Sequence, residues 1–228
     1  MVKELNRILD EIEEDDRIRV LIISGLGRAF CAGADVSEFP GISPFKAMVL
    51  SRKLQQLFNK LEYYPKPIIA AINGYALGGG LELALSCDLR IATENSELGQ
   101  PEINLGLIPG AGGTQRLPRL IGISKAKELI YTGDRINANE AYKIGLVDRV
   151  VPYDKLEDET RRIALKIAEK SPLSLLAAKY SIQFGIETNI WSGLSNEANL
   201  FGLLFSTDDF VEGVSAFFEK RKPKFKGK

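Results

Sequence analysis

The sequence contains no histidine in 228 residues. This absence excludes Ser-His and Cys-His nucleophile systems and any zinc site that needs an imidazole ligand, and no metal site is expected. Proton transfer near neutral pH must therefore fall to Glu, Asp, Lys, Tyr or Cys side chains. Cysteine is scarce as well, since only Cys31 and Cys87 occur, in apolar or glycine-containing surroundings. We expect both to be buried free thiols rather than a disulfide.

Net charge and long apolar runs are also missing. Thirty Lys and Arg residues balance thirty Asp and Glu residues, so no overall field attracts nucleic acid. No apolar run approaches the roughly 18 residues of a membrane span, and Met1–Asn6 lacks the apolar core of a signal peptide. These absences predict a cytoplasmic protein with neither a nucleic-acid partner nor a membrane association.

The first part of the chain alternates between patterns typical of strands and of helices. Strands are expected at Arg17–Ser24, Pro67–Ile72, Leu89–Ala92 and Leu146–Val151, and helices at Val2–Glu14, Pro44–Tyr63 and Gly78–Ser86. Phe30–Asp35 is expected to be a loop of small residues. Alternation of this kind favours an α/β fold with parallel strands and right-handed crossovers.

Beyond Gly110 the pattern becomes mainly helical. Helices are expected at Gly113–Ile121, Ser124–Tyr131, Asn137–Ile144, Leu156–Lys170, Pro172–Phe184, Trp191–Phe205 and Asp208–Glu219. We therefore divide the chain into a sheet-containing core, residues 1–151, and a C-terminal helical region, residues 152–228.

The most informative stretch is Ile69–Arg116, above all Ala76-Leu-Gly-Gly-Gly-Leu-Glu82, whose three glycines follow an apolar run and lead into a helix, and Gly99-Gln-Pro-Glu102. A turn through glycines onto a helix start leaves backbone N–H groups that no side chain shields. Glu82 lies one turn into that helix, and Glu102 follows a Gly-Gln-Pro break. The pattern indicates backbone donors for a developing negative charge, with two carboxylates available for proton transfer.

Several sequence blocks resemble the crotonase superfamily, the enoyl-CoA hydratase/isomerase group. The blocks are Phe30–Asp35, Ala71–Glu82, Cys87–Asp88, Gly99–Glu102, Pro109–Leu117, Thr132–Asp134 and Phe218–Pro223. The resemblance implies a crotonase-like spiral of ββα units with a C-terminal helical oligomerisation region. It also implies a homo-oligomer, a trimer or a dimer of trimers, and an acyl-CoA thioester substrate whose CoA makes any other cofactor unnecessary.

The resemblance also assigns site residues. Glu82 and Glu102 match the catalytic pair, with Glu82 as base on water and Glu102 as acid to the α-carbon. The backbone N–H groups of Ala34 and Gly79 match the oxyanion hole. The positions expected to bind substrate are Ala32, Asp35, Val36, Ser37, Gly110, Phe217 and Lys220. Gly110 would help to hold the reacting water, and Phe217 and Lys220 would reach the CoA of a neighbouring subunit.

Structural alternatives exist for these residues. Either glutamate could be a helix-start carboxylate favoured by the helix dipole, although apolar neighbours argue against a solvated face for Glu82. Asp35 is expected to act as a helix N-cap rather than in catalysis. Gly110 could be a turn glycine, and the basic stretch Lys220–Lys228 a solvated tail.

The competing functions are hydration of an enoyl thioester, Δ3–Δ2 isomerisation on the carboxylate of Glu102 alone, and inactive acyl-CoA binding. Family members usually begin with a further strand and loop ahead of Met1, and this difference motivates the third possibility. One branch of the superfamily binds RNA through a basic first helix. Here the corresponding residues are acidic and would repel phosphate, namely Glu4, Asp10, Glu11, Glu13, Glu14, Asp15 and Asp16.

Overall fold

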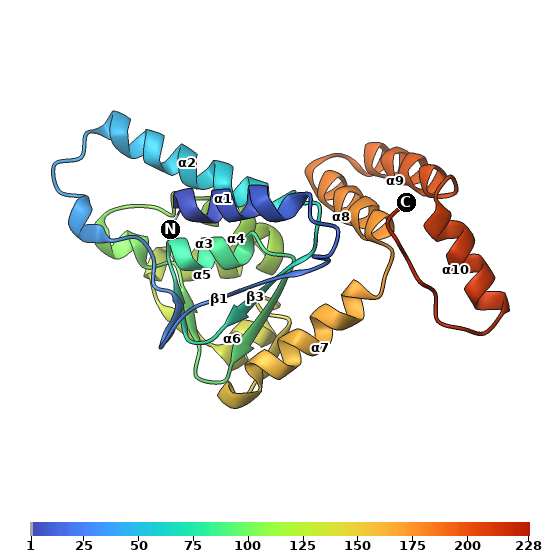
Figure 1. Ribbon diagram of the computed structural model, residues 1–228. Coiled ribbons are helices and arrows are strands. Elements are labelled where there is room, and N and C mark those ends of the chain that lie inside the picture. The colour runs from blue at the N-terminus through green and yellow to red at the C-terminus, as the bar shows by residue number, and fades with distance from the viewer. Residues whose placement is uncertain (1) are drawn as a thin grey trace.

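The centre of the molecule consists of two four-stranded sheets (Figure 1). The computed structural model describes residues 2–228. The first sheet has the order β1-β3-β5-β8 and is parallel throughout: β1 Leu21–Ser24, β3 Ile68–Ile72, β5 Leu89–Thr93 and β8 Arg149–Val151. The second has the order β2-β4-β6-β7: β2 Ala29–Cys31, β4 Tyr75–Leu77, β6 Glu97–Gly99 and β7 Arg135–Asn137. Only β7 is antiparallel to its neighbour.

Each of the first three strands of the parallel sheet leads directly into a strand of the second sheet. The pairs β1–β2, β3–β4 and β5–β6 are followed by α2 (Pro44–Glu62), α3 (Gly79–Leu85) and α4 (Gly113–Ile121). The expected ββα units are confirmed. The loop predicted at Phe30–Asp35 is wrong for Phe30 and Cys31, which belong to β2. Strands of three residues are too short to show the alternation that identifies a strand.

Helices cover both faces of the first sheet. All five residues of β3 are buried, as a strand between two layers should be. On one face, α1 (Val2–Glu13) and α2 contribute to the main core, which includes Leu9 and Leu61. On the other face, α7 (Leu156–Ala168) packs Leu156 and Ala164 against the sheet. α5 (Ile123–Thr132) and α6 (Ala138–Lys143) complete the core near β7.

The last three helices form an arm beside the sheets (Figure 1). α8 (Pro172–Glu187) is fixed to the body by an ion pair between Lys179 and Asp88 at 2.9 Å. α9 (Ile190–Leu204) packs along α8, and a Cβ at Gly193 would lie 3.3 Å from the Gly185 Cα atom. α10 (Asp208–Phe218) extends away from the sheets beyond α9.

The tail after α10 returns toward the body (Figure 1). Asp209 is buried, and its carboxylate accepts hydrogen bonds from the N–H groups of Lys226 at 2.7 Å and Gly227 at 3.0 Å. Arg19 donates to the carbonyl of Phe225 at 3.2 Å. The tail therefore connects α10 with the segment that precedes β1.

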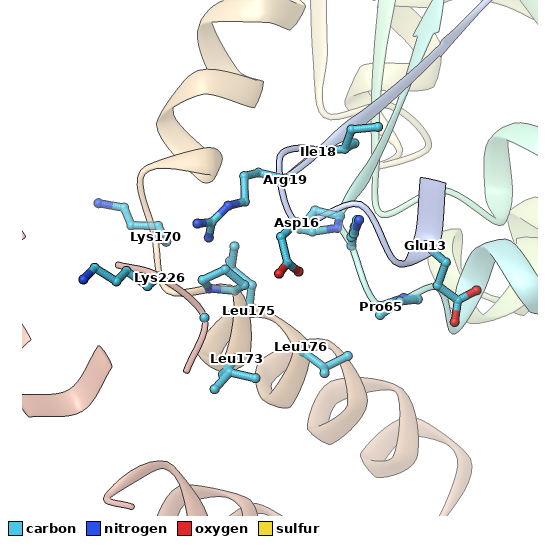
Figure 2. A pocket seen from close by; sticks show the side chains of 14 residues that line it. Glu13, Asp16, Ile18, Arg19, Pro65, Lys170, Leu173, Leu175, Leu176 and Lys226 are labelled. Carbon is cyan, nitrogen blue, oxygen red and sulfur yellow. The ribbon is translucent and has the colours of Figure 1, made fainter. Parts of the chain in front are cut away.

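A cavity of about 180 Å³ lies where this tail meets the body. Arg19 lines it on one side and Leu175 of α8 on the other (Figure 2). A second cavity, of about 450 Å³, lies between β1 and α7 and is lined by Ile22 and Thr160. Neither contains a predicted site residue. Within residues 2–228, no helix is long and apolar enough to cross a membrane, and no group of His, Cys, Asp or Glu is arranged to hold a metal ion.

Candidate active site

Two of the three consecutive glycines, Gly78 and Gly80, occupy positions that a side chain would disturb. Gly78 has φ +54°, and a Cβ there would lie 2.9 Å from Glu102 Oε1. At Gly80 a Cβ would collide with the Cys31 carbonyl at 1.9 Å, so α3 can pack directly on β2. A Cβ at Gly79 would lie 4.0 Å from Glu82 Oε2 and from the Gly33 Cα, at ordinary contact distance. The glycines thus bring the helix start beside both carboxylates.

Glu82 is almost fully buried, with 2% of its surface exposed. Its Oε1 atom accepts hydrogen bonds from the N–H groups of Ala111 and Gly113, both at 2.7 Å. Burial raises the pKa of the Glu82 carboxyl, and these N–H donors and the charge of Arg116 oppose the increase. Two N–H donors on one oxygen favour the ionised form of the carboxyl.

Glu102 lies in the short 3-10 helix Pro101–Leu105 and is partly buried. Burial, together with the charge of Glu82, raises the pKa of Glu102 to about 7, although a hydrogen bond from its own backbone N–H acts in the opposite direction. Gln100 is fully buried, and its side-chain nitrogen, oriented according to its neighbours, donates to both Glu102 oxygens at 3.0 Å. The two carboxyls therefore differ: backbone N–H groups favour the ionised form of Glu82, whereas Glu102 has a pKa near neutral pH.

The predicted oxyanion donors lie next to each other. Gly79 is the first residue of α3, so its N–H has no partner within the helix. A Cβ at Gly33, which has φ +103°, would lie 4.0 Å from the Gly79 nitrogen. The chain following β2, which includes Ala34, therefore passes close to the helix start. The N–H groups of Ala34 and Gly79 have no hydrogen-bond partner among residues 2–228.

The other predicted contacts of the β2–α2 loop are exposed to solvent. Ala32 and Val36 are exposed, and Asp35 is the N-cap of the 3-10 helix Val36–Glu38. The Asp35 carboxylate accepts from the Ser37 hydroxyl at 2.6 Å and the Ser37 N–H at 3.0 Å, which lowers the pKa of Asp35. The predicted N-cap is confirmed.

Gly110 is held by side chains that the sequence reasoning missed. Its carbonyl accepts from the Ser51 hydroxyl at 2.6 Å and from Gln55 Nε2 at 2.9 Å, both on α2. The spacing of Ser51 and Gln55 by four residues on one helix could have indicated a shared target. Gln100 was also missed as a partner of Glu102, although it belongs to the Gly-Gln-Pro-Glu block.

Phe217 and Lys220 do not join this site within one chain. Phe217 lies near the end of α10, is 79% exposed, and contacts the neighbouring Phe218 ring. Lys220 is exposed, with φ +54°. Figure 1 shows α10 on the far side of the arm from α3.

Both cysteines are free. Cys87 is buried as predicted, and burial raises the pKa of its thiol to about 12. Cys31 is only partly buried, because β2 lies at the edge of the second sheet. Burial was therefore predicted correctly for Cys87 and wrongly for Cys31.

A spiral of ββα units with two carboxyls beside a glycine-rich helix start defines the crotonase class of folds. The chain matches the enoyl-CoA hydratase/isomerase family over residues 1–228, and it belongs to that family.

Relatives and solved structures agree with this membership. A crotonyl-CoA hydratase from Syntrophomonas wolfei is 46% identical over 97% of this chain and 86% of its own. A short-chain-enoyl-CoA hydratase from Clostridium acetobutylicum is 43% identical over 97% of this chain and 85% of its own. The crystal structure of an enoyl-CoA hydratase from Bacillus anthracis has a TM-score of 0.96 and 48% identity, covering 100% of this chain and 88% of that one.

Proposed function

We propose that this protein is an enoyl-CoA hydratase that adds water reversibly, with syn geometry, to a 2-enoyl-CoA and forms a 3-hydroxyacyl-CoA. The observation that carries the proposal is the pairing of an ionised, hydrogen-bonded Glu82 with Glu102, whose pKa is about 7. The relatives named crotonyl-CoA and short-chain-enoyl-CoA hydratase support it. CoA enters as part of the acyl thioester, and the reaction needs no further cofactor.

In the proposed reaction, negative charge develops on the thioester oxygen as water attacks the β-carbon. The N–H groups of Ala34 and Gly79 stabilise that charge, and one such donor contributes about 2.7–4 kcal/mol in comparable sites. The positive end of the α3 dipole lies at Gly79 and adds to the effect. Glu82 takes a proton from the water while Glu102 gives one to the α-carbon, each role contributing roughly 10²- to 10⁴-fold.

Isomerisation between Δ3 and Δ2 double bonds is the alternative activity, and it needs one carboxyl, that of Glu102. Two backbone N–H groups bind the Glu82 carboxylate, and this favours hydration. Isomerisation by proton transfer on Glu102 alone would not require a second carboxylate. An inactive acyl-CoA binder would retain affinity for the thioester without either reaction.

One experiment separates these possibilities. The purified protein is incubated with crotonyl-CoA and, separately, with a 3-enoyl-CoA. Ultraviolet absorbance follows the conjugated 2-enoyl thioester, which hydration removes from the first reaction and isomerisation forms in the second. We expect rapid hydration of crotonyl-CoA and little isomerisation. Isomerisation without hydration would replace the proposed activity, and binding of crotonyl-CoA without turnover would identify an inactive binder.

We also propose that the protein assembles as a homo-oligomer, a trimer or a dimer of trimers, through the C-terminal helical region. Large apolar side chains on α9 and α10 remain exposed in the single chain: Trp191, Leu194, Phe201, Leu203, Phe205, Phe210, Val211, Val214, Phe217 and Phe218. A patch of this kind is larger than an isolated subunit normally leaves in water. In this assembly Phe217 and Lys220 of one subunit contact the CoA of its neighbour.

A further inference from the structure

Two side chains of α2 share one acceptor beside the candidate active site. The Ser51 hydroxyl donates to the Gly110 carbonyl at 2.6 Å, and Gln55 Nε2 donates to the same oxygen at 2.9 Å. Gln55 also donates to the Ser51 oxygen at 3.2 Å, so the two side chains hold each other.

The Gly110 carbonyl belongs to the same peptide unit as the N–H of Ala111. That N–H donates to Glu82 Oε1 at 2.7 Å. A peptide unit is planar and rigid, so fixing its carbonyl also fixes the direction of its N–H. A carbonyl that accepts hydrogen bonds also polarises its amide, which strengthens the N–H as a donor.

On these contacts we infer that Ser51 and Gln55 are positioning residues that hold the Gly110–Ala111 peptide unit against the Glu82 carboxylate. The inference rests on the proposed role of Glu82 as the base. Neither side chain needs to touch substrate, because both act through the backbone.

The next carbonyl along the chain is held as well. Arg116 donates to the Ala111 carbonyl at 3.1 Å and is itself paired with Glu62 of α2. The N–H of that peptide unit belongs to Gly112, and the second donor to Glu82 Oε1, the N–H of Gly113, comes from the unit after it. Side chains from α2 and α4 therefore hold the carbonyl side of the loop while its N–H groups face the buried carboxylate. With 2% exposure, Glu82 has little water to replace a weakened donor.

The test is the pH profile of kcat/KM for crotonyl-CoA hydration in Gln55→Leu and in the double variant Ser51→Ala, Gln55→Leu. Losing donors makes the ionised base harder to form, so the acid limb should move to higher pH. We expect the double variant to lose roughly 5- to 30-fold in kcat at pH 6, less at pH 8, with KM little changed. Ser51→Thr, which keeps the hydroxyl, should stay near wild type.

Gln56→Leu is the matched control, since Gln56 is the exposed neighbour on the same helix. It should leave the profile unchanged. A uniform loss at every pH, with the acid limb unmoved, would reduce Ser51 and Gln55 to structural supports and overturn the inference. If the double variant fails to fold, Gln55→Leu is compared with the wild type by itself, because Gln55 is exposed and its replacement should leave the fold intact.

A second measurement keeps this inference separate from the proposed function. The Glu82 carboxyl is titrated by carbon NMR in the wild type and in Gln55→Leu, which requires no turnover. An upward shift of the Glu82 titration supports positioning even if the wild type does not hydrate crotonyl-CoA. Identical titration curves would overturn it even in an active hydratase.

Discussion

The segment from β3 to β6 is largely buried, whereas the arm formed by α9 and α10 is largely exposed to solvent. In β3 every residue is buried, and in α3 every residue after Gly79 is buried, including the charged Glu82. In α9 only Gly193 is buried, while Trp191 is 79% exposed. The first region completes its packing and its hydrogen bonds within one chain, and the second does not. Chemistry is therefore expected to reside in the former and association in the latter.

The largest effect should come from the two carboxyls of the buried region. Glu82→Gln and Glu102→Gln should each lower hydration turnover by at least roughly 10²-fold, because each removes a proton-transfer group and keeps the shape. The double variant should lose far less than the product of the two, since the groups act as one unit. Steady-state kinetics with crotonyl-CoA measures this. Near-normal turnover in either folded single variant would contradict the assignment.

A similarly sharp loss is expected from Gly79→Val. A Cβ at Gly79 would lie 4.0 Å from Glu82 Oε2 and the Gly33 Cα, so the γ-methyl groups of a valine would crowd the space where we place the thioester. Turnover should fall severely, while Ala34→Gly, which keeps its N–H, should be mild. Normal binding and hydration by Gly79→Val would mean that the thioester does not lie at the start of α3.

Breaking the arm should have a different signature. Deletion of residues 208–228 removes α10 and the tail, exposes more of α9 and should weaken both assembly and substrate affinity. Light scattering reports the mass, and KM for crotonyl-CoA reports the affinity. The variant Lys220→Ala is the finer test, because it should raise KM while leaving the mass unchanged. A fully active wild-type monomer, with truncation leaving KM unaltered, would rule the assembly out.

The smallest effect concerns pH and Glu102. Its pKa is about 7 in the folded protein and near 4.5 when unfolded, so its ionisation costs stability as pH rises from about 4.5 to 7. In Glu102→Gln that cost is absent. The Tm difference between variant and wild type should therefore grow in the variant's favour from pH 5 to pH 8 in a thermal melt. A constant difference across that range would mean that Glu102 titrates normally.

The sequence predicted the long elements well and the short ones poorly. Helix Pro44–Tyr63 and strand Pro67–Ile72 appear within one residue of their expected ends. The apolar spacing of the helix extends over several turns, and the strand is a continuous apolar run between prolines and Asn73. The strand expected at Arg17–Ser24 is shorter, Leu21–Ser24. The local pattern did not reveal the strands of the second sheet, which only the resemblance to ββα units implied. These strands have three residues each and are defined by their neighbours rather than by their own pattern.

At the site, the sequence identified the candidate catalytic residues and missed the side chains that hydrogen-bond to them or to their donors. Glu82 and Gly79 stand in a recognisable block. Ser51 is 59 residues from Gly110, and only the folded chain shows that they are hydrogen-bonded. Supporting contacts of this kind depend on tertiary packing, so a single sequence reveals them poorly.

The tail that returns from α10 has a consequence for association. Asp209 and Arg19 hold the tail by hydrogen bonds to its backbone, so the start of α10 and the segment before β1 are joined within a single chain. A surface that is already ordered before a partner binds loses little conformational entropy on binding, and this favours tighter association. The tail after α10 thus fixes the start of α10 relative to the body before any second subunit binds.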